Sequence, residues 1–236
     1  MGSFPIDGLL PDLCARLSRS GVLILQAPPG AGKTSRVPLA LMGELVDGVQ
    51  PDGRILLIEP RRLAAKAAAT RLAQSIGEPV GARIGYSVRN EQKRSEATVV
   101  EAITDGLFLR RLQSQPDLPG IGTVIFDEFH ERRRDSDVAL ALLREARRLL
   151  RPELKLLLMS ATLQMESLAA QFECAETLTS HGRAFPVETH HFPPRDQEPL
   201  ESHVLRALEE ELTQIECNRR IGENPPGVLV FLPGVR

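Results

Sequence analysis

The chain has 236 residues, of which 42% are hydrophobic and 25% are charged, and its formal net charge is −2. These values are ordinary for a soluble globular protein, and the length suits one large domain or one domain and part of another. No apolar stretch approaches the roughly 20 residues that cross a membrane. The near-zero charge excludes a broad basic surface, so we expect any nucleic acid to bind through local contacts or through other parts of a longer protein.

The three cysteines, Cys14, Cys174 and Cys217, are far apart in the sequence. Their odd number and spacing fit neither a disulfide framework nor a zinc module, and they are typical of a reducing compartment. The N-terminus lacks the basic region followed by an apolar region that marks a secretory signal. We therefore expect a cytoplasmic protein that does not act at a membrane.

Five short apolar runs alternate with helical patterns along the first two thirds of the chain. The runs cover residues 22–26, 54–59, 98–102, 123–127 and 154–160. They are mostly uninterrupted, as strands that are covered on both faces require. Between them, apolar residues recur at helical spacing. This alternation predicts an α/β fold of the RecA-like type, with a central parallel sheet flanked by helices.

A proline-rich stretch at 192–199 marks a break in this pattern. It is followed by a helix with an apolar face over 205–215 and by one further apolar run at 228–232, which is a strand candidate. These elements are too few for an independent domain. We therefore expect a RecA-like ATP-binding domain over 1–182 and the truncated start of a second RecA-like domain over 183–236.

Residues 27–34 read Ala-Pro-Pro-Gly-Ala-Gly-Lys-Thr and follow the first predicted strand. Gly30 and Gly32 allow the backbone to turn so that its N–H groups cradle phosphate oxygens at a helix N-terminus. The Lys33 ammonium suits the β- and γ-phosphates of ATP, and the Thr34 hydroxyl suits Mg²⁺. The pattern therefore predicts a P-loop NTPase. The residues that we expect to bind ATP here are Pro29, Gly30, Ala31, Gly32, Lys33, Thr34 and Ser35.

An ordinary strand-to-helix turn that happens to contain Gly-Lys-Thr is the alternative interpretation of this segment. Ala27 stands where the general phosphate-loop pattern has glycine. The flanking elements nevertheless favour the phosphate loop, because a strand precedes it and a helix is predicted over 35–45.

The acidic residues Asp127 and Glu128 follow the fourth apolar run, at the sheet edge where ligands of open α/β sheets bind. Asp127 can hold Mg²⁺, and Glu128 can orient and deprotonate an attacking water. The alternative is that both acids cap a helix that begins near Asp135, but the phosphate loop disfavours it. We expect the metal ligands to be Thr34, Asp127 and Glu128. The expected catalytic set is Lys33, Asp127, Glu128 and His130, although a histidine alone is more often a packing or hydrogen-bonding residue.

Ser160-Ala161-Thr162 ends the fifth apolar run. The hydroxyls of Ser160 and Thr162 are able to hydrogen-bond the acidic residues and couple their state to other parts of the protein. Serine and threonine are also common helix N-caps, so the three residues alone are a weak signal.

These phrases occur in an order that resembles the first half of a DEAH-box helicase of the second helicase superfamily. The ordered phrases are residues 27–34, Glu-Pro-Arg-Arg-Leu-Ala-Ala at 59–65, Thr-Asp-Gly at 104–106, Asp-Glu-Phe-His-Glu-Arg at 127–132, Ser-Ala-Thr at 160–162 and Val-Leu-Val-Phe-Leu-Pro-Gly at 228–234. Phenylalanine at 129, together with the phrase at 59–65, resembles the bacterial HrpB branch of that family most closely. The resemblance covers nearly the whole chain.

The resemblance implies nucleic-acid contacts in two segments of the chain. The residues concerned are Pro60, Arg61, Arg62, Thr104, Asp105 and Gly106. Hydroxyl, guanidinium and backbone N–H groups are common phosphate binders; the alternative for the two arginines is a solvated first turn of a helix. Arg71 matches the arginine that stacks on the nucleotide base in this family, and its alternative is an ordinary exposed helix residue.

The implied function is that of an ATP-dependent RNA helicase, which uses ATP and Mg²⁺ to move along single-stranded RNA and displace a paired strand, with DNA left open as a substrate. The family's catalytic arginines lie in a second domain beyond this chain, so we expect these 236 residues to bind nucleotide but to hydrolyse it poorly. Two alternatives remain at this point. One is an ATP-gated RNA clamp or assembly factor without processive unwinding, and the other is a P-loop switch or kinase without a nucleic-acid partner.

Overall fold

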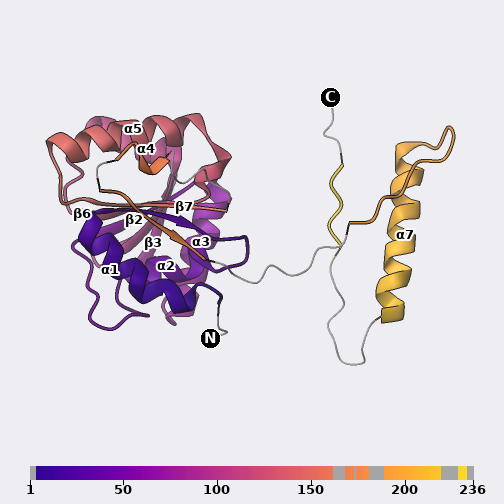
Figure 1. The fold of residues 1–236 in the computed structure, drawn as a ribbon, viewed down its shortest axis with the longest axis horizontal. Coiled ribbons are helices and arrows are strands. Elements are labelled where there is room, and N and C mark those ends of the chain that lie inside the picture. The colour runs from indigo at the N-terminus through magenta and orange to yellow at the C-terminus, as the bar shows by residue number, and fades with distance from the viewer. Residues whose placement is uncertain (1–3, 162–167, 173, 181–188, 219–227, 233–236) are drawn as a thin grey trace. The chain divides into compact units, whose positions relative to one another are not determined.

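The computed structural model describes residues 4–161, 168–172, 174–180, 189–218 and 228–232. The chain divides into two units, Met1–Phe185 and Pro186–Arg236, and each is described by itself. Figure 1 shows the helices and the sheet of the first unit and the single long helix of the second.

The first unit is built around an eight-stranded sheet with the order β4-β3-β5-β2-β6-β7-β1-β8. Every neighbouring pair is parallel except β3 and β4, which are antiparallel. The predicted α/β class with a central parallel sheet is therefore confirmed. The strands are β1 Val22–Gln26, β2 Arg54–Glu59, β3 Ile84–Val88, β4 Glu91–Lys93, β5 Val100–Thr104, β6 Ile121–Phe126, β7 Lys155–Ser160 and β8 Glu176–Thr179.

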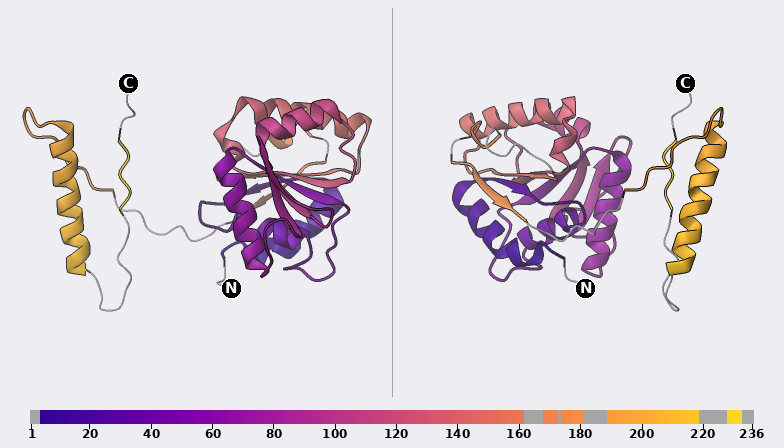
Figure 2. Two further views of the ribbon diagram at one scale, coloured as in Figure 1. Left: turned by 180° about the vertical axis from the view of Figure 1, so that it is seen from behind. Right: turned by 45° about the vertical axis from the view of Figure 1, so that its right-hand side comes forward.

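Helices cover both faces of this sheet, as Figures 1 and 2 show, with α1, α2 and α3 on one face and α4 and α5 on the other. The helices of the first unit are α1 Leu10–Ser20, α2 Lys33–Leu41, α3 Arg62–Ser75, α4 Asp105–Ser114 and α5 Arg134–Leu149, with 3-10 turns η1 Asp7–Leu9 and η2 Phe129–Glu131. Of the helices that the structure describes, none is long and apolar enough to cross a membrane.

Two hydrophobic cores lie on the two faces of the sheet, and successive residues of each strand alternate between them. In β1, Leu23 and Leu25 belong to the core under α1, α2 and α3, whereas Val22 and Ile24 belong to the core under α4 and α5. All four side chains are at most 1% exposed. This double burial is the reason that the strands read as uninterrupted apolar runs.

Three strands were not predicted from the sequence. β3 contains glycine and serine, β4 consists of three exposed polar residues, and β8 is only four residues long. β5 covers Val100–Thr104 rather than 98–102 because Thr98 is used in a turn, where its hydroxyl donates to the Ala82 carbonyl oxygen at 2.8 Å. Short or polar strands of this kind carry little hydrophobic signal, since their pairing depends on neighbours that are distant in sequence.

The helix predicted over 35–45 begins at Lys33 and ends at Leu41. Its early end follows from Gly43, which has a φ of +87°. A Cβ at this position would lie 2.4 Å from the Val49 carbonyl oxygen, so the chain turns away here.

In the second unit, α7 spans Leu200–Asn218 and includes the predicted helical segment 205–215. The predicted strand at 228–232 is wrong, because these residues form no strand and are exposed. A strand needs a neighbour for its N–H and C=O groups, and no described segment of the second unit pairs with them.

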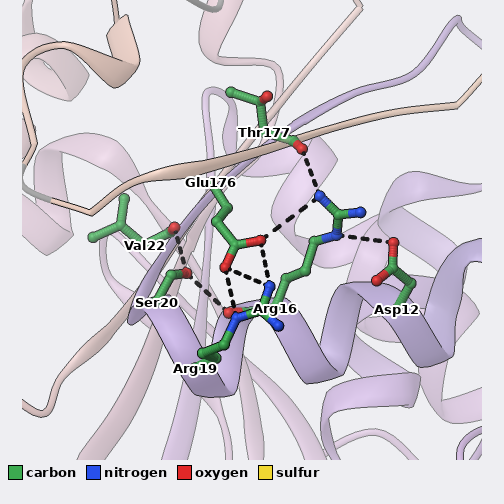
Figure 3. A network of polar contacts seen from close by, with 7 residues as sticks. All are labelled: Asp12, Arg16, Arg19, Ser20, Val22, Glu176 and Thr177. Carbon is green, nitrogen blue, oxygen red and sulfur yellow. Dashed lines mark hydrogen bonds and ion pairs between the residues drawn. The ribbon is translucent and has the colours of Figure 1, made fainter.

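The edge strand β8 is held to α1 by a group of ion pairs that Figure 3 shows. The Arg19 guanidinium lies 2.9 Å from the Glu176 carboxylate, and Arg16 lies 3.6 Å from the same carboxylate. Arg16 also pairs with Asp12 one turn earlier, at 2.9 Å. Exposed pairs contribute little singly, so their role here is to fix where β8 lies along α1.

The buried carboxylate of Glu101 joins four parts of the first unit. Its side chain is fully buried and accepts hydrogen bonds from Arg111 of α4 at 2.7 Å and from Ser87 of β3 at 2.6 Å. Arg54 and Arg94 lie 3.6 Å away. Burial alone would raise the pKa of Glu101, but the hydrogen bond and charge of Arg111 outweigh it and hold the pKa below its usual value.

We predict that Glu101→Gln lowers the free energy of unfolding by about 3 kcal/mol at pH 7, because the arginines around it lose the fully buried carboxylate that they share. Urea denaturation measures this change. Glu145→Gln on α5 is the matched control, since Glu145 pairs with Arg148 at an exposed site. Equal shifts of the two urea midpoints would show that the buried Glu101 network contributes no more to stability than an exposed ion pair.

Candidate functional site

The loop predicted to bind phosphate connects β1 to α2 at the carboxyl edge of the sheet. Gly30 and Gly32 have φ angles of +79° and +95°, which residues with a Cβ rarely adopt. α2 begins directly after Gly32, so the positive end of its dipole and its unpaired N–H groups lie at the loop. The local geometry is therefore that of an anion site.

Lys33 is buried at 5% exposure although its side chain ends in an ammonium group. Its Nζ donates to the carbonyl oxygens of Ala27 at 2.6 Å and Pro28 at 3.4 Å, both in the same loop. The cation is thus held inside the turn of the loop rather than in solvent.

The loop and the acidic residues meet through a side-chain contact. The Thr34 hydroxyl donates a short hydrogen bond to Oδ2 of Asp127, which follows directly after β6. Asp127 is 5% exposed, and its other oxygen, Oδ1, accepts the Glu128 N–H at 2.8 Å. Residues 93 positions apart in sequence are therefore in contact at one edge of the sheet.

The pKa of Asp127 is raised to about 6, chiefly by burial and in part by the charge of Glu128, against the lowering effect of the Thr34 hydrogen bond. Glu128 itself has a left-handed backbone, with φ +48° and ψ 38°. Such a conformation costs a non-glycine residue about 1–2 kcal/mol and is common at functional sites. The 3-10 turn η2 begins at the next residue.

His130 connects the acidic residues to the Ser-Ala-Thr segment. Its Nδ1 lies 3.3 Å from a Glu128 carboxylate oxygen and 3.5 Å from the Ala161 N–H. The Ser160 carbonyl oxygen accepts the Ala27 N–H at 3.0 Å, so the same segment also touches the phosphate loop. These contacts use main-chain atoms of the segment; the predicted role of the Ser160 hydroxyl stays a prediction, and Thr162 lies outside the described residues.

Glu59, the last residue of β2, is a site residue that sequence reasoning missed. It is 4% exposed, and its pKa is raised to about 8 by burial and by the charges of Asp127 and Glu128, with Arg71 acting in the opposite direction. Arg71 of α3 is therefore within electrostatic range of the acidic group. A carboxylate that ends an uninterrupted apolar strand was the available signal.

The two segments predicted to contact nucleic acid line one pocket of about 380 Å³ at the same sheet edge. From the predicted set, it contains Pro60, Arg62, Thr104, Asp105 and Gly106. Arg89, Arg110 and Arg133 also line it and were not predicted. The pocket thus gathers four guanidinium groups from separate parts of the chain, which suits a polyanionic ligand.

Arg61 and Asp105 differ from the rest of the predicted set. Arg61 does not line the pocket; it is exposed and lies 3.3 Å from the Glu131 carboxylate. The buried Asp105 carboxylate accepts the Arg133 guanidinium at 2.7 Å and the Gly106 N–H at 2.7 Å. A buried anion repels phosphate, so the side chain of Asp105 is suited to positioning Arg133.

The parallel sheet, the glycine-rich turn before α2 and the acidic pair after β6 define a RecA-like nucleotide-binding domain of the P-loop type. The sequence profile of the DEAD/DEAH box helicases matches residues 12–170, which is more than half of the chain. The chain therefore belongs to the DEAD/DEAH box helicase family, as its ordered motifs predicted.

Individual relatives agree with this assignment. The chain is 40% identical over 235 residues to the ATP-dependent RNA helicase HrpB of Escherichia coli strain K12, and the match covers 100% of this chain and 27% of that protein. A crystal structure of the Escherichia coli DEAH/RHA helicase HrpB superposes with a TM-score of 0.82 at 40% identity, over 90% of this chain and 27% of that one. A second, of the Escherichia coli DExH-box NTPase HrpB, gives 0.76 at 39% identity, over 91% and 26%. The chain spans about a quarter of the length of these relatives.

We predict that Glu59→Gln stabilises the protein relative to wild type, increasingly as the pH rises from 5 to about 8. Because the folded-state pKa of about 8 lies above the ordinary value of 4.5, wild-type stability is full below pH 4.5 and is lost as the pH rises through 8. Glutamine does not ionise, so the difference should grow by about 1.4 kcal/mol for each pH unit between the two pKa values and level off at roughly 5 kcal/mol above pH 8. Thermal melting across this pH range tests it. If the stability difference between Glu59→Gln and wild type is the same at every pH, the pKa of Glu59 is not raised in the folded protein.

Proposed function

We propose that this chain is the ATP-binding half of an ATP-dependent RNA helicase, which couples ATP hydrolysis to movement along RNA and to strand displacement. The observation that supports it most directly is the hydrogen bond between Thr34 and Asp127. It places a phosphate-loop hydroxyl against a carboxylate from a different strand, beside the buried ammonium of Lys33. This is the set of groups that a magnesium–triphosphate complex requires.

The Thr34 hydroxyl and the Asp127 carboxylate are hard oxygen donors, which fits Mg²⁺. Bound Mg²⁺ would neutralise the phosphate charge. Among the described residues, no three His, Cys, Asp or Glu side chains are arranged to hold a metal, so the ion is expected to arrive with the nucleotide and to use its phosphates as further ligands. With a pKa of about 6, Asp127 is largely ionised at pH 7 and therefore able to act as a ligand of Mg²⁺.

Each remaining side chain of the proposed site has a separate task. Lys33 exchanges the carbonyl oxygens of Ala27 and Pro28 for phosphate oxygens. Glu128 orients the attacking water and takes its proton, aided by a backbone conformation that sets the direction of its side chain. His130 links Glu128 to Ala161 through Nδ1, which is able to donate to the Glu128 carboxylate or to accept the Ala161 N–H, but not both at once.

We place single-stranded RNA, with DNA left open, along the pocket that contains Arg62 and Arg89. Guanidinium groups and the backbone of Thr104 and Gly106 suit the sugar–phosphate chain without reading its bases. Arg71 suits the nucleotide base, because a guanidinium plane stacks on an aromatic ring. Residues 183–236 begin the second RecA-like domain, whose arginines would complete hydrolysis. Two unpaired thiols, Cys14 and Cys174, support a cytoplasmic location.

We predict that Glu128→Gln lowers the ATPase rate about 10²- to 10⁴-fold while ATP affinity changes less than threefold, because an amide cannot accept the proton. Turnover is measured in a protein that includes the second domain, and affinity by titration with a fluorescent nucleotide. Glu145→Gln on the exposed face of α5 is the control and should retain turnover. Near-normal hydrolysis in Glu128→Gln would remove this residue as the base.

We further predict that Arg62→Ala and Arg89→Ala each weaken single-stranded RNA binding about threefold to tenfold and reduce its salt dependence, because each removes a phosphate contact. Arg148→Ala, which changes an arginine paired with Glu145, is the control. An equal loss of RNA affinity in all three variants would indicate that RNA is attracted by the overall charge of the protein rather than bound in the pocket. If RNA neither binds nor stimulates ATPase activity, the protein is a P-loop switch rather than a helicase. A strand-displacement assay distinguishes a helicase from an RNA clamp.

A further inference from the structure

The N-terminal segment 4–9 packs against the outer side of the phosphate loop. The Ile6 N–H donates to the Ala31 carbonyl oxygen at 3.2 Å, and the Ile6 side chain is fully buried in the core under α1 and α2. The segment precedes the stretch that matches the helicase profile, which begins at residue 12.

Phe4 makes the closest approach to the loop. A Cβ at Gly32 would lie 2.8 Å from the Cγ and Cδ1 atoms of the Phe4 ring, so the ring rests directly on the glycine backbone. The Arg36 guanidinium lies over the same ring, 5.5 Å from its centroid. The ring therefore lies between the Gly32 backbone and the Arg36 guanidinium.

Asp7 binds both Phe4 and Arg36. Its carboxylate accepts the Arg36 guanidinium at 2.7 Å and 3.0 Å and the Phe4 N–H at 2.9 Å. Burial tends to raise the pKa of Asp7, but the hydrogen bonds from Arg36 and Phe4 outweigh it and lower the pKa, so the pair stays charged at neutral pH. Arg36 is on the first turn of α2, and its N–H donates to the Gly32 carbonyl oxygen at 2.9 Å.

We propose that residues 4–9 are a brace that holds the phosphate loop in its nucleotide-binding conformation, with Phe4 and Asp7 as positioning residues. This inference rests on the nucleotide site proposed above. The brace fixes the loop at two points, the Ala31 carbonyl through Ile6 and the left-handed Gly32 through Phe4 and Arg36. Neither Phe4 nor Asp7 needs to touch the nucleotide.

The physical basis is the cost of ordering the loop. Glycine in a loop has many accessible conformations, and each one that must be given up on binding weakens affinity. A loop already held in the bound conformation avoids that loss, so preorganisation strengthens binding without adding a contact to the ligand. Removing the brace should therefore weaken nucleotide affinity while the reacting groups remain in place.

The test compares Phe4→Ala, Asp7→Asn and wild type in the full chain, with ADP and a fluorescent ATP analogue as probes. We expect Kd to rise about fivefold to tenfold in both variants, equally for the two nucleotides. Amide hydrogen exchange at residues 30–34 should become faster, and the melting temperature without nucleotide should change by about 2 °C or less. Phe4→Leu, which keeps an apolar side chain over Gly32, should restore most of the affinity.

Asp12→Asn is the matched control, because it removes an aspartate–arginine pair on neighbouring α1 that does not touch the loop (Figure 3). A fall in melting temperature with unchanged Kd in Phe4→Ala and Asp7→Asn would reduce the segment to ordinary packing and overturn the proposal. So would an equal loss of affinity in Asp12→Asn. If Phe4→Ala does not fold, Asp7→Asn alone decides.

The failure of the brace is distinguishable from the failure of the proposed function. If wild type binds ADP and the variants bind it equally well, the nucleotide site stands and the brace falls. If wild type binds neither nucleotide in the presence of Mg²⁺, the nucleotide site itself is refuted and the brace falls with it.

Discussion

The hydrogen bond between the Thr34 hydroxyl and the Asp127 carboxylate joins the two parts of the proposed nucleotide site. It forms because β1 and β6 are parallel members of one sheet, so the loop after β1 and the residue after β6 reach the same edge. The ends of β2, β5 and β7 reach that edge too, and they deliver Glu59, Thr104 and Ser160. The direction of the strands thus collects groups that are far apart in the sequence, from Thr34 to Ser160.

Negative charge at this edge is concentrated and poorly solvated. Burial and mutual repulsion raise the pKa values of Glu59 and Asp127 to about 8 and about 6. Each ionised carboxylate there is costly in the absence of a cation, since burial disfavours charge. The Lys33 ammonium offsets part of that cost at Asp127, and a divalent metal would offset more. The acidic cluster is therefore an unfavourable arrangement for the fold alone and a favourable one for a magnesium-bound nucleotide.

The sequence predicts the buried central strands well, because a strand covered on both faces leaves a continuous apolar run, as in Val22–Gln26 and Arg54–Glu59. It does not predict the pocket that joins Arg62 to Arg89 and Arg110, since only the sheet order brings these residues together. The contact of Phe4 with Gly32 is equally hidden, because the N-terminal segment must first fold back across α2. The roles of the individual site residues stay predictions.

The two edge strands of the sheet affect self-association of the protein. β4 is three residues long and consists of Glu-Gln-Lys, all exposed, and β8 at the opposite border is four residues long and tethered through Glu176 to two arginines. Open borders of a sheet invite intermolecular pairing unless they are short, charged or anchored. Both borders meet these conditions, which disfavours edge-to-edge pairing of the first unit with another copy.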